Sequence, residues 1–310
     1  MNNSNSTLKL GINLAFVRKR WTSPEEWFSI VKEKLGLEYV EFCSDLLDPV
    51  FVSEPTRSRL AAEIKSKAEE YGLQIVDYCT GMMPHCINLL SHPDPEVRQD
   101  GFRWCEGAVK VAAKMGARGI GGHFDAISFR DWSDENRYEF YIAGLIQAFR
   151  GLSKLAGERG LEFILWEQMY VPGEVPYTID QAEEVYRRTN EDAGLPVYLL
   201  VDIGHACCQN YPHKPQDRDP YTWLRRLAPI SPVIHIHQTT ADASCHWPFT
   251  REYNEAGIIR PEKVIEAINS SGSKENYLVF EVFHPLAADE GQVLDELSQT
   301  VEYWRRHVEE

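Results

Sequence analysis

Four short apolar runs in the second half of the chain each end in a carboxylate or an imidazole side chain. The runs are EFILWE, VYLLVD, VIHIH and YLVFE, and they end at Glu167, Asp202, His237 and Glu281. Parallel strands of a barrel end at the same rim, so side chains at their carboxyl ends converge there. We therefore expect these four residues to bind one divalent cation.

Apolar runs alternate with amphipathic stretches along the whole chain, and eight such units can be counted. Strands are expected near 8–15, 37–42, 73–79, 117–123, 161–167, 197–202, 232–237 and 276–282. Helices are expected near 24–34, 57–71, 94–115, 135–158, 178–192, 219–228, 261–270 and 288–308. This alternation predicts an α/β protein built as a single (β/α)8 TIM barrel, and a doubly wound open sheet is the alternative. The GxGxxG signature of a dinucleotide fold does not occur.

Local signals mark where several of these elements begin and end. Ser23-Pro24 and Ser133 are expected to cap helix starts, as is Asp94 before Pro95. Five glycines stand between a helix and the next strand, where a left-handed helix cap would use glycine. They are Gly36, Gly72, Gly116, Gly160 and Gly194.

Composition limits the functions open to the chain. At 310 residues with 43% hydrophobic side chains, we expect one domain over 1–310, with residues 1–7 as a disordered tail. A net charge of −15 disfavours nucleic acid and anionic membranes as partners, so a small-molecule substrate is expected. No membrane-spanning run or signal peptide is evident, and seven irregularly spaced cysteines read as reduced thiols, which indicates a cytoplasmic enzyme. Barrels of this type often self-associate, so a homo-oligomer is a further expectation.

The ligand set indicates which metal the site would prefer. Three carboxylates and one imidazole form a fairly hard set that suits Mn²⁺, Mg²⁺ or Co²⁺. His235 points the same way as His237 two residues later, and its deeper position favours a supporting role rather than coordination.

Other polar residues follow the strand ends, in the loops that would form the mouth of a barrel. His205, three residues after Asp202, is expected to reach a substrate oxygen. Arg251 and Glu174 are further candidates for substrate binding. His123 and Asp125, in GGHFD, either line the pocket or cap the next element.

These features together resemble the xylose-isomerase-like barrel superfamily, and within it the ketose 3-epimerases of the tagatose and psicose type. The resemblance covers nearly the whole chain and rests on the four strand-end residues, the DxxH spacing of Asp202 and His205, and the HxH motif at 235–237. It implies a metal held by Glu167, Asp202, His237 and Glu281, with the two glutamates also acting as the acid and base.

Two departures from the family pattern affect the substrate-binding residues. The family's second glutamate after strand 5 falls on Gly173, so Glu174 takes that role only if the loop shifts by one residue. The family's short arginine-bearing loop is replaced by the longer CHWPFTREYNEAG, which contains Arg251. The loops that select the sugar therefore differ from the family.

The implied chemistry is epimerisation of a ketose at C3. A cation polarises the carbonyl, one glutamate removes the proton on the neighbouring carbon, and the other returns it to the opposite face. The same parts give aldose–ketose isomerisation if the proton returns to the adjacent carbon, and a sugar-acid or inosose dehydratase if water leaves. The loops and acidic chain also resemble epimerases of phosphorylated tetruloses from erythritol breakdown, such as erythrulose 1-phosphate. Arg130, Arg251 and Lys274 are candidates to bind that phosphate.

Overall fold

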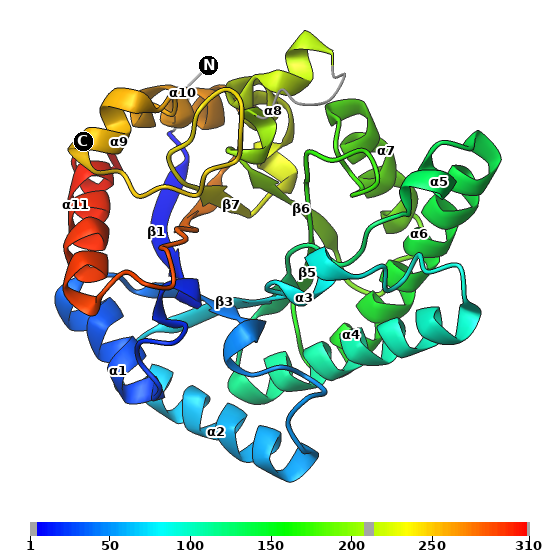
Figure 1. The fold of residues 1–310 in the computed structure, drawn as a ribbon, viewed down its shortest axis with the longest axis horizontal. Coiled ribbons are helices and arrows are strands. Elements are labelled where there is room, and N and C mark those ends of the chain that lie inside the picture. The colour runs from blue at the N-terminus through cyan, green and yellow to red at the C-terminus, as the bar shows by residue number, and fades with distance from the viewer. Residues whose placement is uncertain (1–4, 208–213, 309–310) are drawn as a thin grey trace. The chain divides into compact units, whose positions relative to one another are not determined.

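The computed structural model describes residues 5–207 and 214–308 of the chain. Its eight strands follow one another in chain order as a closed parallel barrel (Figure 1). The strands are β1 (Thr7–Asn13), β2 (Tyr39–Cys43), β3 (Gln74–Cys79), β4 (Gly119–Gly121), β5 (Phe163–Glu167), β6 (Val197–Asp202), β7 (Val233–Ile236) and β8 (Glu275–Phe280). The predicted (β/α)8 architecture is confirmed.

Helices follow the strands as the sequence pattern predicts. The main ones are α1 (Pro24–Ser29), which continues as a π-helix over Ile30–Lys34, α2 (Glu54–Glu70), α4 (Pro95–Met115), α6 (Glu135–Glu158), α7 (Ile179–Asn190), α8 (Pro220–Leu227), α10 (Pro261–Ser271) and α11 (Glu290–Val308). Three short helices occupy stretches that we expected to be loops, namely α3 (Met83–Cys86), α5 (Phe129–Trp132) and α9 (Arg251–Ala256). Four to six residues are too few to show a helical repeat of apolar positions, so periodicity could not predict these helices.

Proline and capping side chains begin several helices. Proline is the first residue of α1, α4, α8 and α10. A backbone N–H at this position would have no acceptor within the helix, so proline, which lacks one, costs no hydrogen bond there. Ser23 and Glu26 form a reciprocal capping box at the start of α1. The predicted cap at Ser133 is wrong, because Asp134 accepts the backbone N–H of Arg137 and Ser133 ends α5 instead.

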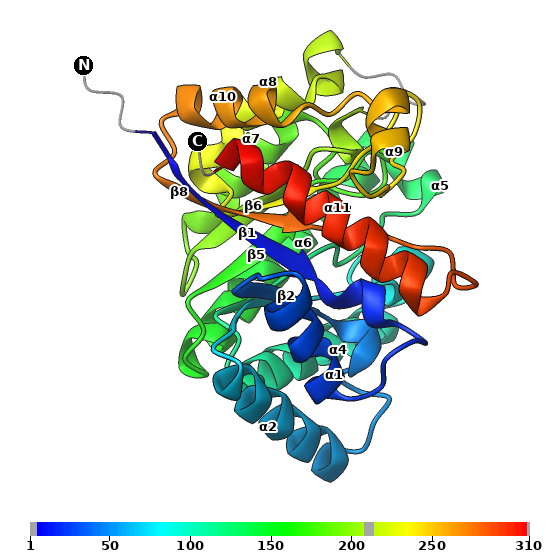
Figure 2. The same cartoon turned by 90° about the vertical axis from the view of Figure 1, so that its left-hand side faces the viewer.

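The chain divides into two compact units, and the first contains 1–41, 67–74 and 201–310. Its strand β1 pairs in parallel with β8 along Thr7–Ile12 and with β2 from Gly11 to Asn13, and β7 pairs with β8. Helices α8 and α10 pack side by side in this unit (Figure 2).

The second unit contains 42–66 and 75–200. Its strand β4 pairs in parallel with β3 and β5, and β5 pairs with the first residues of β6. Helix α6 packs against α4 and α7. No helix of the described residues has the length and apolar character needed to cross a membrane.

Two other expectations need correction. The prediction of a disordered tail over residues 1–7 is wrong for Thr7, which already belongs to β1. Residues 1–4 lie outside the described part of the chain. Gly36, Gly72, Gly116 and Gly160 have the positive φ expected of left-handed caps, but Gly194 does not. A Cβ at Gly194 would lie 2.6 Å from the Cα of Lys154, so close packing requires glycine there. The single domain over 1–310 stays a prediction.

The element that follows Asp125 is α5, and Ser128 caps it, so Asp125 does not cap the next element. Its buried carboxylate accepts the backbone N–H of Leu89 at 2.6 Å and so fixes the segment that follows β3. Burial raises the pKa of Asp125 from an ordinary value of 3.8 to about 6, against the opposing effect of hydrogen bonds from Ser91 and Leu89.

We predict that Asp125 makes the protein less stable as the pH rises from about 4 to about 6. In that range the unfolded chain has lost the proton that the folded protein still holds. The contribution of Asp125 to the free energy of unfolding therefore falls by up to ~3 kcal/mol. Asp125→Asn should remove this decline, which urea unfolding at pH 4 and pH 7 would measure. If the wild type and Asp125→Asn lose the same stability between pH 4 and pH 7, the Asp125 carboxyl does not retain its proton in the folded protein.

Gly119 in β4 gives a second prediction. A Cβ there would overlap the ring of Phe163 on β5, so Gly119→Ala should lower the free energy of unfolding by about 1–3 kcal/mol. The matched control is Gly144→Ala in α6, where a Cβ meets no atom within 4 Å and should stabilise the helix by up to about 1 kcal/mol. Thermal unfolding of both variants tests this, and similar stabilities would refute the close packing at Gly119.

Candidate functional site

Three of the four predicted ligands lie together in the first unit. Asp202 is the last residue of β6, while His237 and Glu281 directly follow β7 and β8. All three are buried, with exposed fractions of 0%, 0% and 7%. Because the carboxyl ends of parallel strands meet at one edge, strand geometry alone brings these polar groups together.

The Asp202 carboxylate is fixed by three hydrogen bonds to a single oxygen. Its Oδ1 accepts the backbone N–H groups of Gly204 and His205 at 2.7 and 2.9 Å, and it lies 3.0 Å from Nε2 of His237. Burial alone would raise the pKa of Asp202, but the neighbouring His205 and His237 imidazoles hold it well below its usual range. Asp202 is therefore an anion inside the protein.

Gly204 explains part of the VDIGH motif. A Cβ at this position would overlap the imidazole ring of His237. Only glycine lets the turn after β6 pass close enough to the ring for its backbone N–H to bond to Asp202. The next residue, His205, is buried, and its ring lies 5.7 Å from that of His246.

Glu281 is surrounded by two imidazoles. Its Oε2 lies 3.2 Å from Nδ1 of His235 and 3.3 Å from Nδ1 of His246. Burial opposes ionisation here too, yet His235 and His246 hold the pKa of the Glu281 carboxyl well below its usual range. The site thus contains at least two buried carboxylate anions.

Asn13 and Glu41 belong to this cluster, and the sequence analysis missed both. Nε2 of His235 lies 2.9 and 3.0 Å from the two carboxylate oxygens of Glu41. Nδ2 of Asn13 donates to Glu41 at 2.5 Å and lies 3.5 Å from Glu281. The sequence does contain a sign of both residues, because each is a polar residue in an apolar run. Asn13 is in LGIN and Glu41 is in YVEFC, and both positions are buried.

His246 is the other residue that the sequence analysis missed. It lies in the long segment after β7 with φ of +50°, an uncommon conformation for a residue other than glycine. Its ring stacks on His237 at 4.0 Å and on Phe283 at 4.4 Å, and its backbone N–H donates to Nδ1 of His237 at 3.1 Å. A single histidine in a long loop carries no periodicity, so only the structure shows this role.

The second unit contains Glu167, His123 and Glu174. Glu167 ends β5 and is buried, and its backbone N–H donates to Gly122. Nε2 of His123 lies 3.9 Å from Glu174, and the ring of His85 packs at 4.5 Å from that of His123. His85, His123 and Glu174 each offer a ligand atom within 4.8 Å of the others, so they form a second cluster of polar groups.

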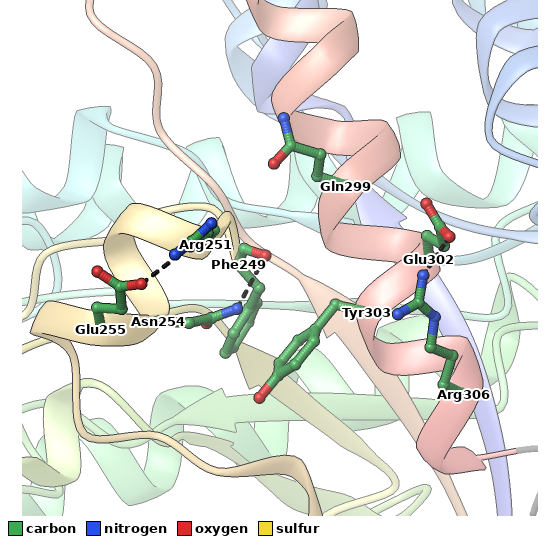
Figure 3. A pocket seen from close by; sticks show the side chains of 8 residues that line it. All are labelled: Phe249, Arg251, Asn254, Glu255, Gln299, Glu302, Tyr303 and Arg306. Atoms are coloured by element: carbon green, nitrogen blue, oxygen red, sulfur yellow. Dashed lines mark hydrogen bonds and ion pairs between the residues drawn. The ribbon is translucent and has the colours of Figure 1, made fainter.

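Arg251 is not brought to the carboxylates of the first unit. Its side chain is 92% exposed and pairs with Glu255 one helical turn later. Figure 3 shows both residues beside a hollow between α9 and α11, which Phe249 and Tyr303 also line. The predicted contact of Arg251 with substrate therefore gains no support from its position.

The other two predicted phosphate partners also gain no support. Arg130 forms an ion pair with the adjacent Asp131 at 3.1 Å. Lys274 immediately precedes β8, so it lies at the opposite end of that strand from Glu281. Of the two candidates in the first unit, neither Arg251 nor Lys274 is placed beside the cluster formed by Asp202 and Glu281.

The cluster in the first unit fits a divalent cation. Nδ1 of His235 lies 3.2 Å from Oε2 of Glu281 and 3.8 Å from Oδ2 of Asp202, so three potential donor atoms face one another. Two carboxylate oxygens and an imidazole nitrogen are ligands that Mn²⁺, Co²⁺ and Zn²⁺ accept, and Mg²⁺ takes the oxygens. Such a group of buried anions is stabilised by a cation.

Comparison with known proteins agrees with this architecture. The family model for the xylose isomerase-like TIM barrel matches residues 31–306. A curated relative, D-erythrulose 1-phosphate 3-epimerase of Brucella abortus (strain 2308), is 26% identical over 304 residues, which is 97% of each chain.

Two solved structures have the same fold over nearly their full length. A Rhodospirillum rubrum protein, provisionally described as a xylose isomerase, has a TM-score of 0.89 at 26% identity over 96% of this chain and 99% of its own. D-psicose 3-epimerase of Clostridium cellulolyticum H10 has a TM-score of 0.72 at 17% identity over 97% and 99% of the two chains. With strand order, strand-end residues and family match in agreement, the chain belongs to the xylose isomerase-like TIM barrel family.

Proposed function

We propose that the protein is an isomerase, a divalent-metal-dependent epimerase that inverts C3 of a short-chain ketose, with a tetrulose phosphate such as erythrulose 1-phosphate as substrate. The observation that carries this proposal is the buried pair of anions Asp202 and Glu281 with imidazoles between them, in a chain that matches a D-erythrulose 1-phosphate 3-epimerase over 97% of its length. The expected cytoplasmic location and self-association belong to the same proposal.

The cation would be held by Glu167, Asp202, Glu281 and an imidazole from the end of β7, where the sequence analysis assigns His237. Glu167 pairs with Leu200 in the β5–β6 ladder, and Asp202 follows two residues later on the same face of β6, which supports its inclusion. A bound Mn²⁺, Mg²⁺ or Co²⁺ would polarise the ketose carbonyl and make the neighbouring C–H more acidic.

Glu167 and Glu281 are the proposed acid and base. One carboxylate takes up the C3 proton, and the other carboxyl, in its protonated form, delivers a proton to the opposite face, which inverts the carbon. Proton exchange of both groups with water then restores the starting state. His205, His123 and Glu174 are proposed to contact the substrate oxygens. His205 and His123 are buried and Glu174 is half-buried, which supports roles away from the open surface.

Glu167→Gln and Glu281→Gln should each lower kcat by about 10²–10⁴-fold, because glutamine has the same shape but cannot take up a proton. Glu262→Gln, at an exposed position of α10, is the matched control and should keep full activity. Initial rates with Mn²⁺ present measure the effect, and circular dichroism checks the fold of each variant. Full activity in both site variants would rule out the two-carboxyl mechanism.

The substrate test uses a panel of free and phosphorylated ketoses with four to six carbons, incubated with protein and Mn²⁺ in deuterated water. NMR should show deuterium at C3 with inverted configuration, and fastest incorporation with erythrulose 1-phosphate. Label at C1 or C2 in an aldose product would instead identify an aldose–ketose isomerase. A product lighter by one water would identify an inosose-type dehydratase.

A further inference from the structure

The turn that follows β1 contains three adjacent cations near the carboxylates of the first unit. They are Arg18, Lys19 and Arg20, and no other part of the sequence has three adjacent Lys or Arg residues. β1 ends at Asn13, whose Nδ2 lies 3.5 Å from Oε1 of Glu281, and a 3₁₀-helix over Leu14–Val17 connects it to the three cations. In a chain of net charge −15, such a group attracts anions to this end of β1.

Arg20 holds this turn in place. Its Nη2 and Nε donate to the backbone carbonyls of Pro285 and Ala288 at 2.6 and 3.0 Å. Its Nη1 donates to the carbonyl of Phe16 at 3.2 Å. The guanidinium therefore joins the turn after β1 to the segment that follows β8, and it fixes the positions of the two preceding cations.

Arg18 lies at the end of a stack of rings that begins at the site. Its Nε donates to the carbonyl of Ala15 at 3.0 Å, and its guanidinium lies 5.0 Å from the centre of the Phe283 ring. That ring stacks on His246 at 4.4 Å, and Nδ1 of His246 lies 3.3 Å from Oε2 of Glu281. Two rings thus separate the half-buried Arg18 from a carboxylate of the site.

Lys19 has an unusual backbone conformation. Its φ is +63°, in the left-handed region that a Cβ makes unfavourable, so glycine would make this turn more stable than lysine does. Strained residues of this kind occur where a side chain serves a ligand. Lys19 is exposed, and within residues 5–207 and 214–308 it has no carboxylate as an ion-pair partner.

A phosphate monoester has the chemistry that these cations would bind. It carries about 1.5–2 negative charges at pH 7 and presents three acceptor oxygens. A guanidinium binds such oxygens through parallel N–H groups, and an ammonium adds a compact charge. Asp202 and Glu281 are anions that repel phosphate, so the phosphate end of a substrate needs cations elsewhere along the same edge. In erythrulose 1-phosphate, only C1 and one oxygen join the carbonyl carbon to phosphorus, so those cations must lie near the carboxylates.

We propose that the turn after β1 is the phosphate-binding part of the substrate site, where Arg18 and Lys19 bind the terminal phosphate of the ketose. Arg20 is a positioning residue that fixes this turn. The inference rests on the proposed function, because it assigns the phosphate end of the same substrate. It replaces Arg130, Arg251 and Lys274, the phosphate partners that the sequence suggested.

The test uses dihydroxyacetone phosphate as the probe. It has the phosphate, C1 and carbonyl of erythrulose 1-phosphate but no stereocentre at C3, so it cannot be epimerised. Calorimetry measures its binding to the protein with Mn²⁺ present, and an NMR titration measures binding of dihydroxyacetone, which lacks the phosphate. The wild type should bind the phosphorylated probe at least about 100-fold more tightly, as two charge-assisted contacts would provide.

Arg18→Gln and Lys19→Gln should each weaken binding of dihydroxyacetone phosphate by about 10–100-fold and leave binding of dihydroxyacetone unchanged. The matched control is Lys34→Gln, an exposed lysine that ends the π-helix after α1 and should bind both probes as the wild type does. Unchanged affinity for the phosphorylated probe overturns the role of the residue replaced. An equal loss for both probes overturns phosphate recognition as the cause.

Lys19→Gly distinguishes a binding lysine from a structural one. Glycine relieves the positive φ, so this variant should have a higher midpoint of thermal unfolding than the wild type, yet it should bind dihydroxyacetone phosphate as weakly as Lys19→Gln does. Wild-type affinity in Lys19→Gly would overturn the role of Lys19. If Arg18→Gln does not fold, because the guanidinium packs on Phe283, the two variants of the exposed Lys19 still decide.

The same measurements separate this inference from the proposed function. Tight binding of dihydroxyacetone phosphate that depends on Lys19, in a wild type that epimerises no ketose, would support the inference and reject the function. Epimerisation of erythrulose 1-phosphate with the same KM in the wild type, Arg18→Gln and Lys19→Gln would do the reverse. A wild type that epimerises free ketoses and binds both probes equally would also overturn the inference, while it keeps the epimerase.

Discussion

The candidate site depends on keeping carboxylate anions buried at the carboxyl ends of β6 and β8. An unpaired buried charge costs several kcal/mol, and Asp202 and Glu281 are removed from water almost completely. The structure offsets this cost with two backbone N–H groups for Asp202 and two imidazole nitrogens near Glu281.

Strands β1 and β2 contribute to the site as much as β7 does. Asn13 ends β1, Glu41 lies within β2, and together they hold His235, which links them to Glu281. The long segment after β7 contributes His246, whose stacking and backbone N–H fix the ring of His237. The candidate site is therefore supported by neighbours on several elements, as precise placement of functional side chains requires.

Much of this architecture could be predicted because its signals are local. The alternation of apolar runs and amphipathic stretches placed every main strand and helix, and the range expected for α6 is the range observed. Strand-end polarity also located Asp202, His237 and Glu281. Asn13, Glu41 and His246 could not be found this way, since their roles come from contacts between segments far apart in the chain. The orientation of the His235 and His237 rings depends on hydrogen bonds that no spacing pattern encodes, and the exposure of Arg251 depends on the path of a long loop.

The most direct test of a cation at this cluster is a crystal structure of the protein grown with Mn²⁺, with anomalous scattering recorded near the manganese absorption edge. We expect one strong anomalous peak about 2.1–2.3 Å from carboxylate oxygens of Asp202 and Glu281 and from an imidazole nitrogen at the end of β7. No peak beside these residues, or a peak elsewhere in the protein, would contradict the account.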